Sequence, residues 1–437
     1  MVTGLQPTRV RYRIIALIFL ITTINYADRA TFSIAGSAAS KELGLDAVKT
    51  GFILSAFAWA YVIAQIPGGA LLDRFGTKRI YAGAILLWSL FTALQGLPGL
   101  VAGASAVLVL FGLRFMVGLA EGPSFPGNAR LVAAWFPGPE RGTASAIFNS
   151  AQYFSIVAFA PLMGWLVHGV GWRSVFWAMG AMGLAAAALF TAFIHSPVRH
   201  PSINDAELRH IEEGGGLVRM EDRGPDSQRT FTWANLKQLL GNRMMLGIYL
   251  GQYCINVLTY FFVTWFPIYL VKERGMSILE AGFAAAVPAL FGFVGGLAGG
   301  FASDLILKRS GSLTVARKAP IVAGMLLATV IVACVWVRSE WLVVTLMALA
   351  FFGKGVGSLG WAVMADVAPK ELAGLSGGVF NTFGNVAGIV TPIVVGYIVA
   401  GTGSFDLALA FVAGHCLMTI VAYLFIVGPI RRLELAA

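Results

Sequence analysis

Apolar residues fall into twelve long stretches of roughly 18 to 26 residues each, with short polar segments between most of them. A helix rises about 1.5 Å per residue, so a stretch of this length can cover a hydrocarbon layer of about 30 Å. The pattern predicts an all-α membrane protein with 12 transmembrane helices. The expected spans cover residues 14–39, 51–72, 80–97, 103–125, 143–169, 172–194, 244–270, 281–302, 319–337, 341–363, 373–400 and 405–427.

One long polar segment separates six of these spans from the other six. We therefore expect an N-terminal six-helix bundle over residues 1–195, a cytoplasmic linker over residues 196–242 and a C-terminal six-helix bundle over residues 243–437. Within the linker, Asn204 precedes Glu207 by three positions, which is the spacing of a capping box. A short surface helix is expected there, ended by the glycines that follow it.

The two halves resemble each other at a nearly constant offset. The segment GGALLDRFGTKR, after the second span, is echoed by GGFASDLILKRS after the eighth, which places Asp73 and Asp304 at an offset of 231 (304 − 73). Asn149 and Asn381 lie at an offset of 232 (381 − 149). Such a repeat indicates two pseudo-symmetric six-helix bundles around a midplane cavity, which is the geometry of alternating-access transporters.

Basic residues are distributed unevenly along this topology. The formal net charge is +10, a value that could also suggest a nucleic-acid-binding protein. With both termini cytoplasmic, 22 of the 31 Lys and Arg residues lie in cytoplasmic segments, six in outer segments and three within spans. Cytoplasmic loops of membrane proteins are rich in Lys and Arg. The charge therefore indicates topology, and nucleic acid is not an expected partner.

Five ionisable residues are expected inside the membrane, namely Asp28, Arg29, Arg114, Glu121 and Lys354. A charge at the bilayer centre costs at least about 2.5 kcal/mol, so each is a candidate functional residue. Residues seven apart in a helix return to nearly the same face, so Arg114 and Glu121 should point the same way. Asp28 and Arg29 are adjacent and should diverge by about 100°.

The charges of this set predict a site for a small organic anion, because three cations outnumber two acids. Arg29 and Arg114 are candidate substrate-binding residues, since a guanidinium donates two parallel hydrogen bonds to a carboxylate. Asp28 and Glu121 are candidate proton-coupling residues, because a substrate that competes for an arginine would release the acid to bind a proton. Alternatively, these pairs are salt bridges that lock or gate the first and fourth spans.

Uncharged polar residues within the spans complete the candidate substrate site. They could hydrogen-bond sugar hydroxyls, although amides and hydroxyls in membranes also join helices to one another. The candidates are Tyr26, Tyr61, Asn149, Gln152, Ser358, Trp361, Asn381 and Asn385.

Lys354 lies in a glycine-rich stretch. It could pair locally or reach toward the membrane interface rather than contact the substrate.

The repeated loop motif is a candidate gate. Its acidic and basic residues fall at helix ends, where they can form ion pairs and interact with helix dipoles. We expect them to hold one conformational state closed on the cytoplasmic side. These residues are Asp73, Arg74, Gly76, Lys78, Arg79 and Asp304.

Residues typical of enzyme chemistry are scattered along the chain. The three cysteines fall within spans and lack metal-ligand spacing, and the five histidines are dispersed without an HExxH motif. We therefore expect no enzymatic activity, no metal and no cofactor. A membrane sensor would require an output module, for which the linker and the tails are too short.

Several of these segments resemble a known family. GGALLDRFGTKR resembles the loop signature of the major facilitator superfamily (MFS), and NYADRATFSIAG, GLRFMVGLAEGPSFPGNARLVAAWFP and GGVFNTFGNVAGIVTP resemble its anion:cation symporter family. Within that family, the similarity is greatest to the bacterial glucarate/galactarate transporters, followed by the galactonate transporters. Gly122 departs from the family pattern EAPSFP, in which alanine holds this position.

The resemblance implies the MFS fold and a set of residue roles. The two acids would be protonation sites, and the two arginines would engage the carboxylate and the gate. The expected function is proton-coupled import of a sugar-acid anion, glucarate or galactarate, with galactonate or a hexuronate as alternatives. The expected setting is the lipid bilayer of the bacterial inner membrane, as a monomer with both termini cytoplasmic. The sugar-acid contacts would fall on Tyr26, Tyr61, Gln152, Ser358, Trp361 and Asn381.

Overall fold

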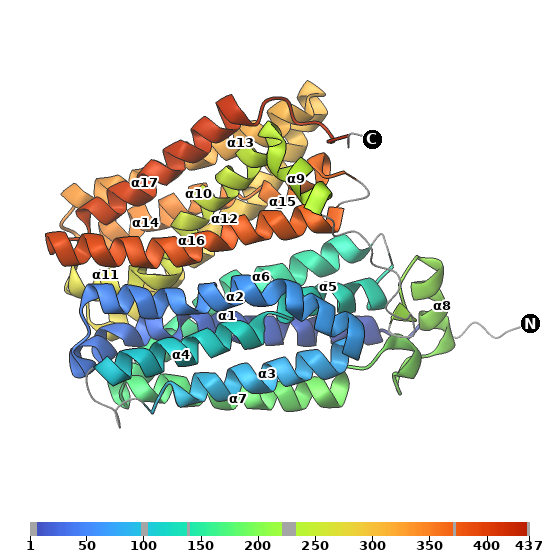
Figure 1. The fold of residues 1–437 in the computed structure, drawn as a ribbon, viewed down its shortest axis with the longest axis horizontal. Coiled ribbons are helices and arrows are strands. Elements are labelled where there is room, and N and C mark those ends of the chain that lie inside the picture. Colours follow the sequence, from blue (N-terminus) through green and yellow to red (C-terminus); the bar gives the residue numbers. More distant parts are fainter. Residues whose placement is uncertain (1–6, 98–103, 138–139, 221–232, 370–372, 435–437) are drawn as a thin grey trace, which may run out of the picture. The chain divides into compact units, whose positions relative to one another are not determined.

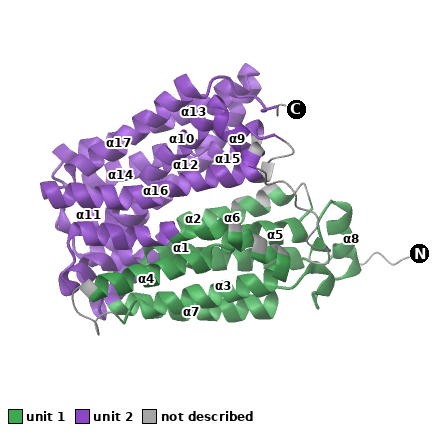
Figure 2. Ribbon diagram, in the orientation of Figure 1, with its two compact units in different colours: residues 1–31, 60–155, 173–228 green, residues 32–59, 156–172, 229–437 purple. Residues whose placement is uncertain are grey.

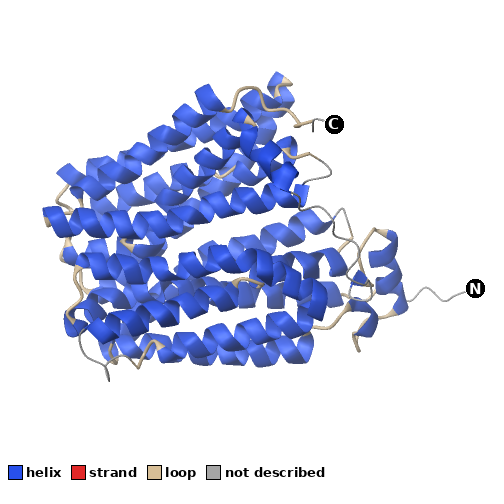
Figure 3. Cartoon of the chain, in the orientation of Figure 1, coloured by secondary structure: helices blue, strands red, loops and turns tan. Residues whose placement is uncertain are grey.

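The computed structural model describes residues 7–97, 104–137, 140–220, 233–369 and 373–434. All regular structure in these ranges is helical (Figure 3). Eleven segments of the described chain are long and apolar enough to cross a membrane. The third expected span falls on α3 (Thr77–Leu94), which is not among the eleven, so the count of 12 stays a prediction.

Figure 1 follows the helices along the chain. The remaining elements are α1 (Val10–Leu43), α2 (Ala47–Phe75), α4 (Ala104–Glu121), α5 (Ser124–Trp135), α6 (Arg141–Gly169), α7 (Trp172–Phe193), η3 (Pro197–Arg199), α8 (Asp205–Glu213), α9 (Trp233–Gly241), α10 (Arg243–Thr264), α11 (Phe266–Lys272), α12 (Ile278–Ser310), α13 (Leu313–Ala328), η6 (Thr329–Trp336), α14 (Glu340–Val356), α15 (Gly360–Val367), α16 (Ala373–Thr402), α17 (Asp406–Val421) and η8 (Ala422–Ile426).

Three expected spans are divided between two α-helices, and the seventh is divided between α10 and α11. The fourth becomes α4 and α5, which are separated at Gly122 and Pro123. Pro123 lacks the N–H that would continue the helical ladder. A Cβ on Gly122 would lie 2.5 Å from the Cβ of Ala64, so the glycine allows α2 to approach this break. The tenth span is likewise divided between α14 and α15. Discontinuous helices occur near the midplane binding sites of many transporters.

The described chain packs as two compact units, which Figure 2 distinguishes by colour. Unit 1 contains residues 1–31, 60–155 and 173–228, and unit 2 contains residues 32–59, 156–172 and 229–437. These units are defined by contacts between residues, and their boundaries differ from those of the two expected six-helix bundles. The division into bundles at residues 195 and 243 therefore stays a prediction.

Within unit 1, α3 is held by its neighbours on several sides. It packs against α4 and α5, and a Cβ on Gly180 of α7 would lie 2.6 Å from the Cβ of Ala93. The Tyr81 hydroxyl donates to Asn128 at 2.8 Å. Asn128 in turn donates to the Thr22 hydroxyl of α1 at 2.9 Å. This buried chain of hydrogen bonds ties α3 and α5 to α1.

Within unit 2, segments from the two halves of the sequence make two close helix contacts. A Cβ on Gly51 of α2 would lie 3.4 Å from the Cα of Gly396 on α16. A Cβ on Gly164 of α6 would lie 3.3 Å from the Cα of Gly282 on α12. Gly51 and Gly282 are 231 positions apart (282 − 51), and Gly164 and Gly396 are 232 apart (396 − 164). The two contacts therefore match each other under the internal repeat.

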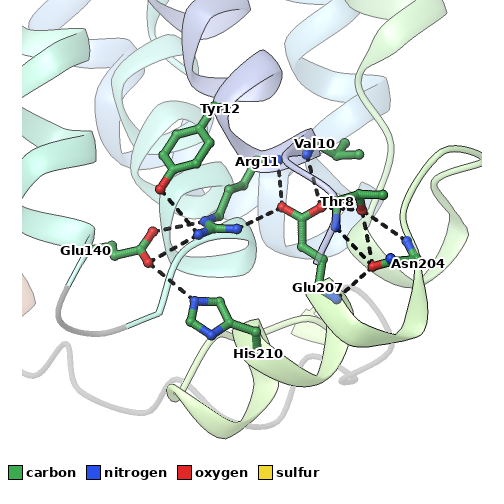
Figure 4. Close-up of polar contacts among 8 residues, drawn as sticks. All are labelled: Thr8, Val10, Arg11, Tyr12, Glu140, Asn204, Glu207 and His210. Atoms are coloured by element: carbon green, nitrogen blue, oxygen red, sulfur yellow. Dashed lines mark hydrogen bonds and ion pairs between the residues drawn. The ribbon is translucent and has the colours of Figure 1, made fainter. Parts of the chain in front are cut away.

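The linker helix α8 is capped at its N-terminus by Asn204 and ends before Gly214, as expected. The capping box is only half formed, which corrects the sequence interpretation. Asn204 accepts from the Glu207 N–H, but the Glu207 carboxylate accepts from the Thr8 hydroxyl at 2.6 Å and from the Val10 N–H at 3.0 Å (Figure 4). The Thr8 hydroxyl also accepts from the Asn204 N–H. The N-terminal segment thus replaces the local partner.

Arg11 completes this contact between the linker and the start of α1. Its guanidinium forms ion pairs with Glu207 at 3.0 Å and with Glu140 at 2.9 Å (Figure 4). His210 contacts Glu140 at 3.3 Å. Burial disfavours the ionised carboxyl, but the hydrogen bonds to Arg11 and His210 outweigh it, so the pKa of Glu140 lies below its ordinary value of 4.5. We call Arg11, Glu140, Glu207 and His210 the N-terminal clamp.

Candidate functional site

The candidate site in unit 1 is centred on an ion pair between α1 and α4. Both Nε and Nη2 of Arg29 lie 3.0 Å from Oε2 of Glu121. The Glu121 side chain is fully buried, and that of Arg29 is 11% exposed. Among the described residues, the second carboxylate oxygen, Oε1, has no hydrogen-bond partner. The guanidinium therefore binds Glu121 through one oxygen and leaves the bidentate arrangement unused.

Aromatic rings lie against this guanidinium. The Arg29 Cζ is 4.4 Å from the ring centroid of Tyr26 and 4.7 Å from that of Tyr61. A cation over an aromatic face is stabilised by the ring quadrupole, and burial strengthens the effect. Two predicted substrate residues are thus brought to Arg29. They restrict its orientation and give the site an apolar wall.

Arg114 faces the same part of α1. The residue is 4% exposed, and its Nη2 lies 3.4 Å from the carbonyl oxygen of Arg29. Arg114 and Glu121, which are seven residues apart, both contact Arg29. The expectation that they share a helix face is therefore confirmed.

Asp28, which is adjacent to Arg29 on α1, makes no hydrogen bond to this ion pair. The residue is 2% exposed. Neither carboxyl oxygen has a hydrogen-bond partner among the described residues. Trp88 of α3 is the neighbouring side chain that comes within reach of this carboxyl. Burial of a carboxyl without hydrogen bonds favours its neutral form.

Two residues near these charges were not predicted. Asn25 accepts a hydrogen bond from Nη2 of Arg29 at 3.2 Å, and its amide is also within reach of Glu121. Its position four residues before Arg29 on α1 was a usable signal, because such residues are neighbours on a helix. Trp88 had no such signal, since it belongs to another helix.

The predicted amides of α6 bond to their own helix. The Asn149 amide donates to the carbonyl of Ser145 at 2.8 Å. The Gln152 amide donates to the carbonyl of Asn149 at 3.1 Å. Both side chains are partly exposed within unit 1. Their carbonyl ends remain possible acceptors for hydroxyl groups.

The remaining predicted substrate residues belong to unit 2. Asn385 donates to the side chain of Asn381 at 3.2 Å and accepts from the hydroxyl of Tyr260 at 2.8 Å. Tyr260 is a further residue that the sequence did not single out. Trp361 packs edge-on against Phe380 and is 53% exposed.

Ser358 and Lys354 lie at the break between α14 and α15. The Ser358 hydroxyl donates to the carbonyl of Lys354 at 2.8 Å. Lys354 is only 5% exposed, and its Nζ lies 5.3 Å from the ring centroid of Phe351. Lys354 is therefore a buried cation near a helix break.

The predicted gating residues of the first motif lie where α2 ends and α3 begins, whereas Asp304 lies within α12, six positions before its last residue, Ser310 (310 − 304). Gly76 precedes α3 with a φ of 86°, a conformation that favours glycine. Arg74, Arg79 and Asp304 are exposed, and Lys78 is half-buried. The side chain of Asp73 lies outside the described residues. The sequence therefore located these helix ends.

Next to the second copy of the motif, the structure places an ion pair that was not predicted. Nε of Arg317 lies 2.7 Å from Asp366, and Nη1 donates to the Ser303 hydroxyl at 2.8 Å. Ser303 directly precedes Asp304 in the sequence. The partners come from α12, α13 and α15, so only the fold could bring them together.

The chemistry available at the unit 1 site is anion binding and proton exchange. The described residues contain no cluster of His, Cys, Asp and Glu that could hold a metal ion. What the site contains is a paired arginine, a second buried arginine and two buried acids. A carboxylate ligand could replace Glu121 as the partner of Arg29.

Comparisons with known proteins agree on one family. Residues 18–316 match the family description "Major Facilitator Superfamily". The "Probable galactarate/D-glucarate transporter GudP" of Escherichia coli K12 is 58% identical over 432 residues, which is 98% of this chain and 96% of that protein. A "D-galactonate transporter" of Escherichia coli O6:H1 is 38% identical over 431 residues, with 99% of each chain covered.

A solved structure supports the same fold. A bacterial homologue of the human lysosomal transporter Spinster superposes with a TM-score of 0.70 at 18% identity, covering 96% of this chain and 95% of that one. The expected fold class and multi-pass membrane character are thereby confirmed. The matched proteins are transporters, which agrees with the expectation of a carrier rather than an enzyme.

Proposed function

Because the chain belongs to the major facilitator superfamily, we propose that it is a proton-coupled symporter that imports glucarate or galactarate by alternating access. The substrate class is supported by relatives named as galactarate/D-glucarate transporters, at 58% identity over nearly the full chain. Both compounds are sugar acids with two carboxylates. The arginines of unit 1 match that chemistry.

The Arg29–Glu121 ion pair is the observation that carries the coupling mechanism. A substrate carboxylate can form two parallel hydrogen bonds with Arg29, whereas Glu121 uses one oxygen. When the substrate takes over the guanidinium, Glu121 remains buried without its cation. The carboxyl then binds a proton, because an unpaired buried charge is costly. Substrate and proton thus occupy the site together.

Asp28 is the second proton-coupling residue in this mechanism. It is buried beside the site and has no hydrogen-bond partner among the described residues. Protonation removes its charge and raises the net positive charge around the arginines. Arg114 contributes the second guanidinium, which holds α1 through the carbonyl of Arg29 and balances the charge of the bound anion.

Alternating access is supported by the paired glycine contacts of unit 2. Helices that approach within backbone contact can separate and re-form as rigid bodies. The α2–α16 and α6–α12 contacts match under the repeat, so both can open in one concerted movement. We assign the α2–α16 and α6–α12 contacts to a conformational state of the transporter. In that state, access is closed at the membrane side that holds the connection between α1 and α2.

The alternative substrates are galactonate and a hexuronate. A protein named as a D-galactonate transporter is 38% identical over 99% of this chain, so the same scaffold suits a sugar acid with one carboxylate. A membrane sensor is the remote alternative. The proposed setting is the bacterial inner membrane, with both termini cytoplasmic and the chain acting as a monomer. The proton serves as the coupling ion, and no cofactor is proposed.

Uptake into liposomes tests this function. Purified protein is reconstituted, and labelled glucarate uptake is measured with competition by unlabelled galactarate, galactonate and glucuronate. We expect uptake that galactarate inhibits best. Stronger inhibition by galactonate or glucuronate would move the substrate to that class, and no uptake of any of these acids would reject the sugar-acid assignment.

A further inference from the structure

A cavity of about 690 Å³ in unit 2 takes no part in the proposed mechanism. Its lining comes from the start of α10, from η8 and from the C-terminal segment that follows η8. The segment Arg243–Thr264 begins at this cavity and the segment Asp406–Ile426 ends at it, and both are long and apolar enough to span a membrane. The cavity therefore lies at a membrane boundary.

The lining of this cavity is basic. It contains three arginines, Arg243, Arg431 and Arg432, and a single acid, Glu434, in the part of the chain that the structure describes, which gives a net charge of +2 (3 − 1). All four residues are exposed. A guanidinium can donate two parallel hydrogen bonds to a phosphate. The cavity thus has the charge and the donors that a phosphate group requires.

The C-terminal segment is fixed on both sides of its two arginines. The Ile430 N–H donates to the hydroxyl of Thr314 on α13 at 3.0 Å. The Leu433 N–H donates to the carbonyl of Val367 on α15 at 2.8 Å. Both arginines of the segment lie between these bonds in the sequence. Their backbone is therefore held against the helices of unit 2.

Arg243 is tied to η8 at the same cavity. Its Nη2 donates to the carbonyl of Phe425 at 2.8 Å. This bond uses one of the five N–H donors of the guanidinium. The group has no second hydrogen bond among the described residues, so its other donors are available to an anion in the cavity.

Apolar side chains lie beside the basic ones, because α10 and η8 pack against each other. Phe425 lines the cavity and is 69% exposed. Leu424 on η8 is 49% exposed, and Leu246 on α10 is 41% exposed. Exposed apolar side chains of a spanning segment face the hydrocarbon of the bilayer. A phospholipid has both matching parts, a charged phosphate at the membrane surface and acyl chains below it.

We propose that this cavity binds an anionic phospholipid, with the three arginines around its phosphate and the exposed apolar side chains against its acyl chains. Basic pockets between spanning helices bind lipid headgroups of this kind. The cytoplasmic leaflet carries anionic lipids, and the cytoplasmic C-terminus proposed above places the cavity on that side. The inference depends on the membrane setting but not on proton coupling or on the identity of the sugar acid.

Native mass spectrometry of the delipidated protein in detergent tests this inference. Phosphatidylglycerol is titrated as the anionic probe, phosphatidylethanolamine as the zwitterionic probe, and inorganic phosphate is added as a competitor. Arg431→Gln/Arg432→Gln removes two of the phosphate ligands. Lys308→Gln/Arg309→Gln is the matched control, because this adjacent basic pair is also exposed in unit 2 but does not line the cavity.

We expect the wild type to bind phosphatidylglycerol more tightly than phosphatidylethanolamine. Arg431→Gln/Arg432→Gln should weaken binding of phosphatidylglycerol about 25-fold, because each arginine near a membrane surface contributes about fivefold. The control variant should keep the wild-type affinity. Glu434→Gln removes the acid of the lining and should tighten binding of phosphatidylglycerol, a result that a folding defect does not produce.

Equal weakening in the two double variants, or equal binding of the two lipids, would overturn the proposal, because either result indicates attraction without a defined site. Displacement of phosphatidylglycerol by an equal concentration of inorganic phosphate would also overturn it, since the ligand would then be the free anion. Lipid binding is measured without transport, so failure of the proposed symport would leave this inference intact.

Discussion

Arg29 and Glu121 form a buried ion pair of 3.0 Å that joins α1 to α4, and the backbone carbonyl of Arg29 lies 3.4 Å from Arg114. The sequence left open that the charged residues of the first and fourth spans form salt bridges, and Arg29 and Glu121 do form one. The same geometry also suits transport. A pair that holds two helices together and can exchange one carboxylate for another links substrate binding to movement of the helices.

Removal of either guanidinium should abolish transport. Arg29→Ala and Arg114→Ala are expected to lower uptake by about a hundredfold or more, because each leaves buried acids without a cation and the substrate without its ligand. Arg29→Lys should also be strongly impaired, since an ammonium lacks the planar fork. Arg209→Ala is the matched control, because Arg209 is exposed on α8. Wild-type uptake in Arg29→Ala would contradict the assigned role.

Neutralising the acids should separate binding from coupling. Glu121→Gln releases Arg29 from its partner, so we expect tighter glucarate binding by calorimetry together with loss of accumulation driven by a proton gradient. Asp28→Asn imitates the protonated state and should retain exchange of internal for external substrate. Full gradient-driven uptake in both variants would remove Asp28 and Glu121 from the coupling mechanism.

Enlarging a glycine at a helix contact should shift the conformational equilibrium. In Gly282→Val, the added atoms meet the carbonyl of Ala160 at 2.8 Å, so α6 and α12 cannot pack as observed. We expect lower uptake and faster maleimide labelling of Ala160→Cys, which is buried in the packed state. Gly296→Val on the same helix is the control, because a Cβ there meets nothing within 4 Å. Equal effects of the two variants would argue against a gate at this contact.

The N-terminal clamp should contribute a pH-dependent part of the stability. The folded-state pKa of Glu140 lies below 4.5, so its contribution is present above that pH and is lost as the pH falls through the lowered value. Thermal unfolding in detergent should show destabilisation by Glu140→Gln near neutral pH that shrinks in acid. A loss that is independent of pH would contradict the ion-pair explanation.

Glu207→Gln should have the larger effect at neutral pH. This carboxylate is fully buried and accepts hydrogen bonds from the N-terminal segment, so its neutralisation should cost about 1 to 3 kcal/mol. Glu212→Gln is the control, because Glu212 is exposed on the same helix. Similar unfolding temperatures for the two variants would show that the clamp contributes little.

Patterns that repeat along one helix were predicted well. The apolar stretches placed the spanning helices, and the seven-residue spacing placed Arg114 and Glu121 toward the same neighbour. Both predictions depend only on helix geometry and hydropathy. The break after Glu121 was missed, although Pro123 marks it, because the expected span ran through the proline.

Contacts between distant residues could not be predicted in this way. Glu207 was interpreted as part of a local capping box, but its partner Thr8 is 199 positions away. Trp88 reaches Asp28 only because α3 packs beside α1, and no spacing in the sequence records that neighbour. The same holds for Arg317 and Asp366. A single sequence defines helix faces, whereas the partner of each face follows from the fold.

The most direct measurement of coupled symport is proton movement caused by the substrate itself. A dense suspension of cells that contain the protein is held without buffer, and glucarate is added while the external pH is recorded. We expect prompt alkalinisation of the medium in wild type and none in Glu121→Gln. Uptake of labelled glucarate by the same wild-type cells without any change in pH would contradict proton-coupled symport.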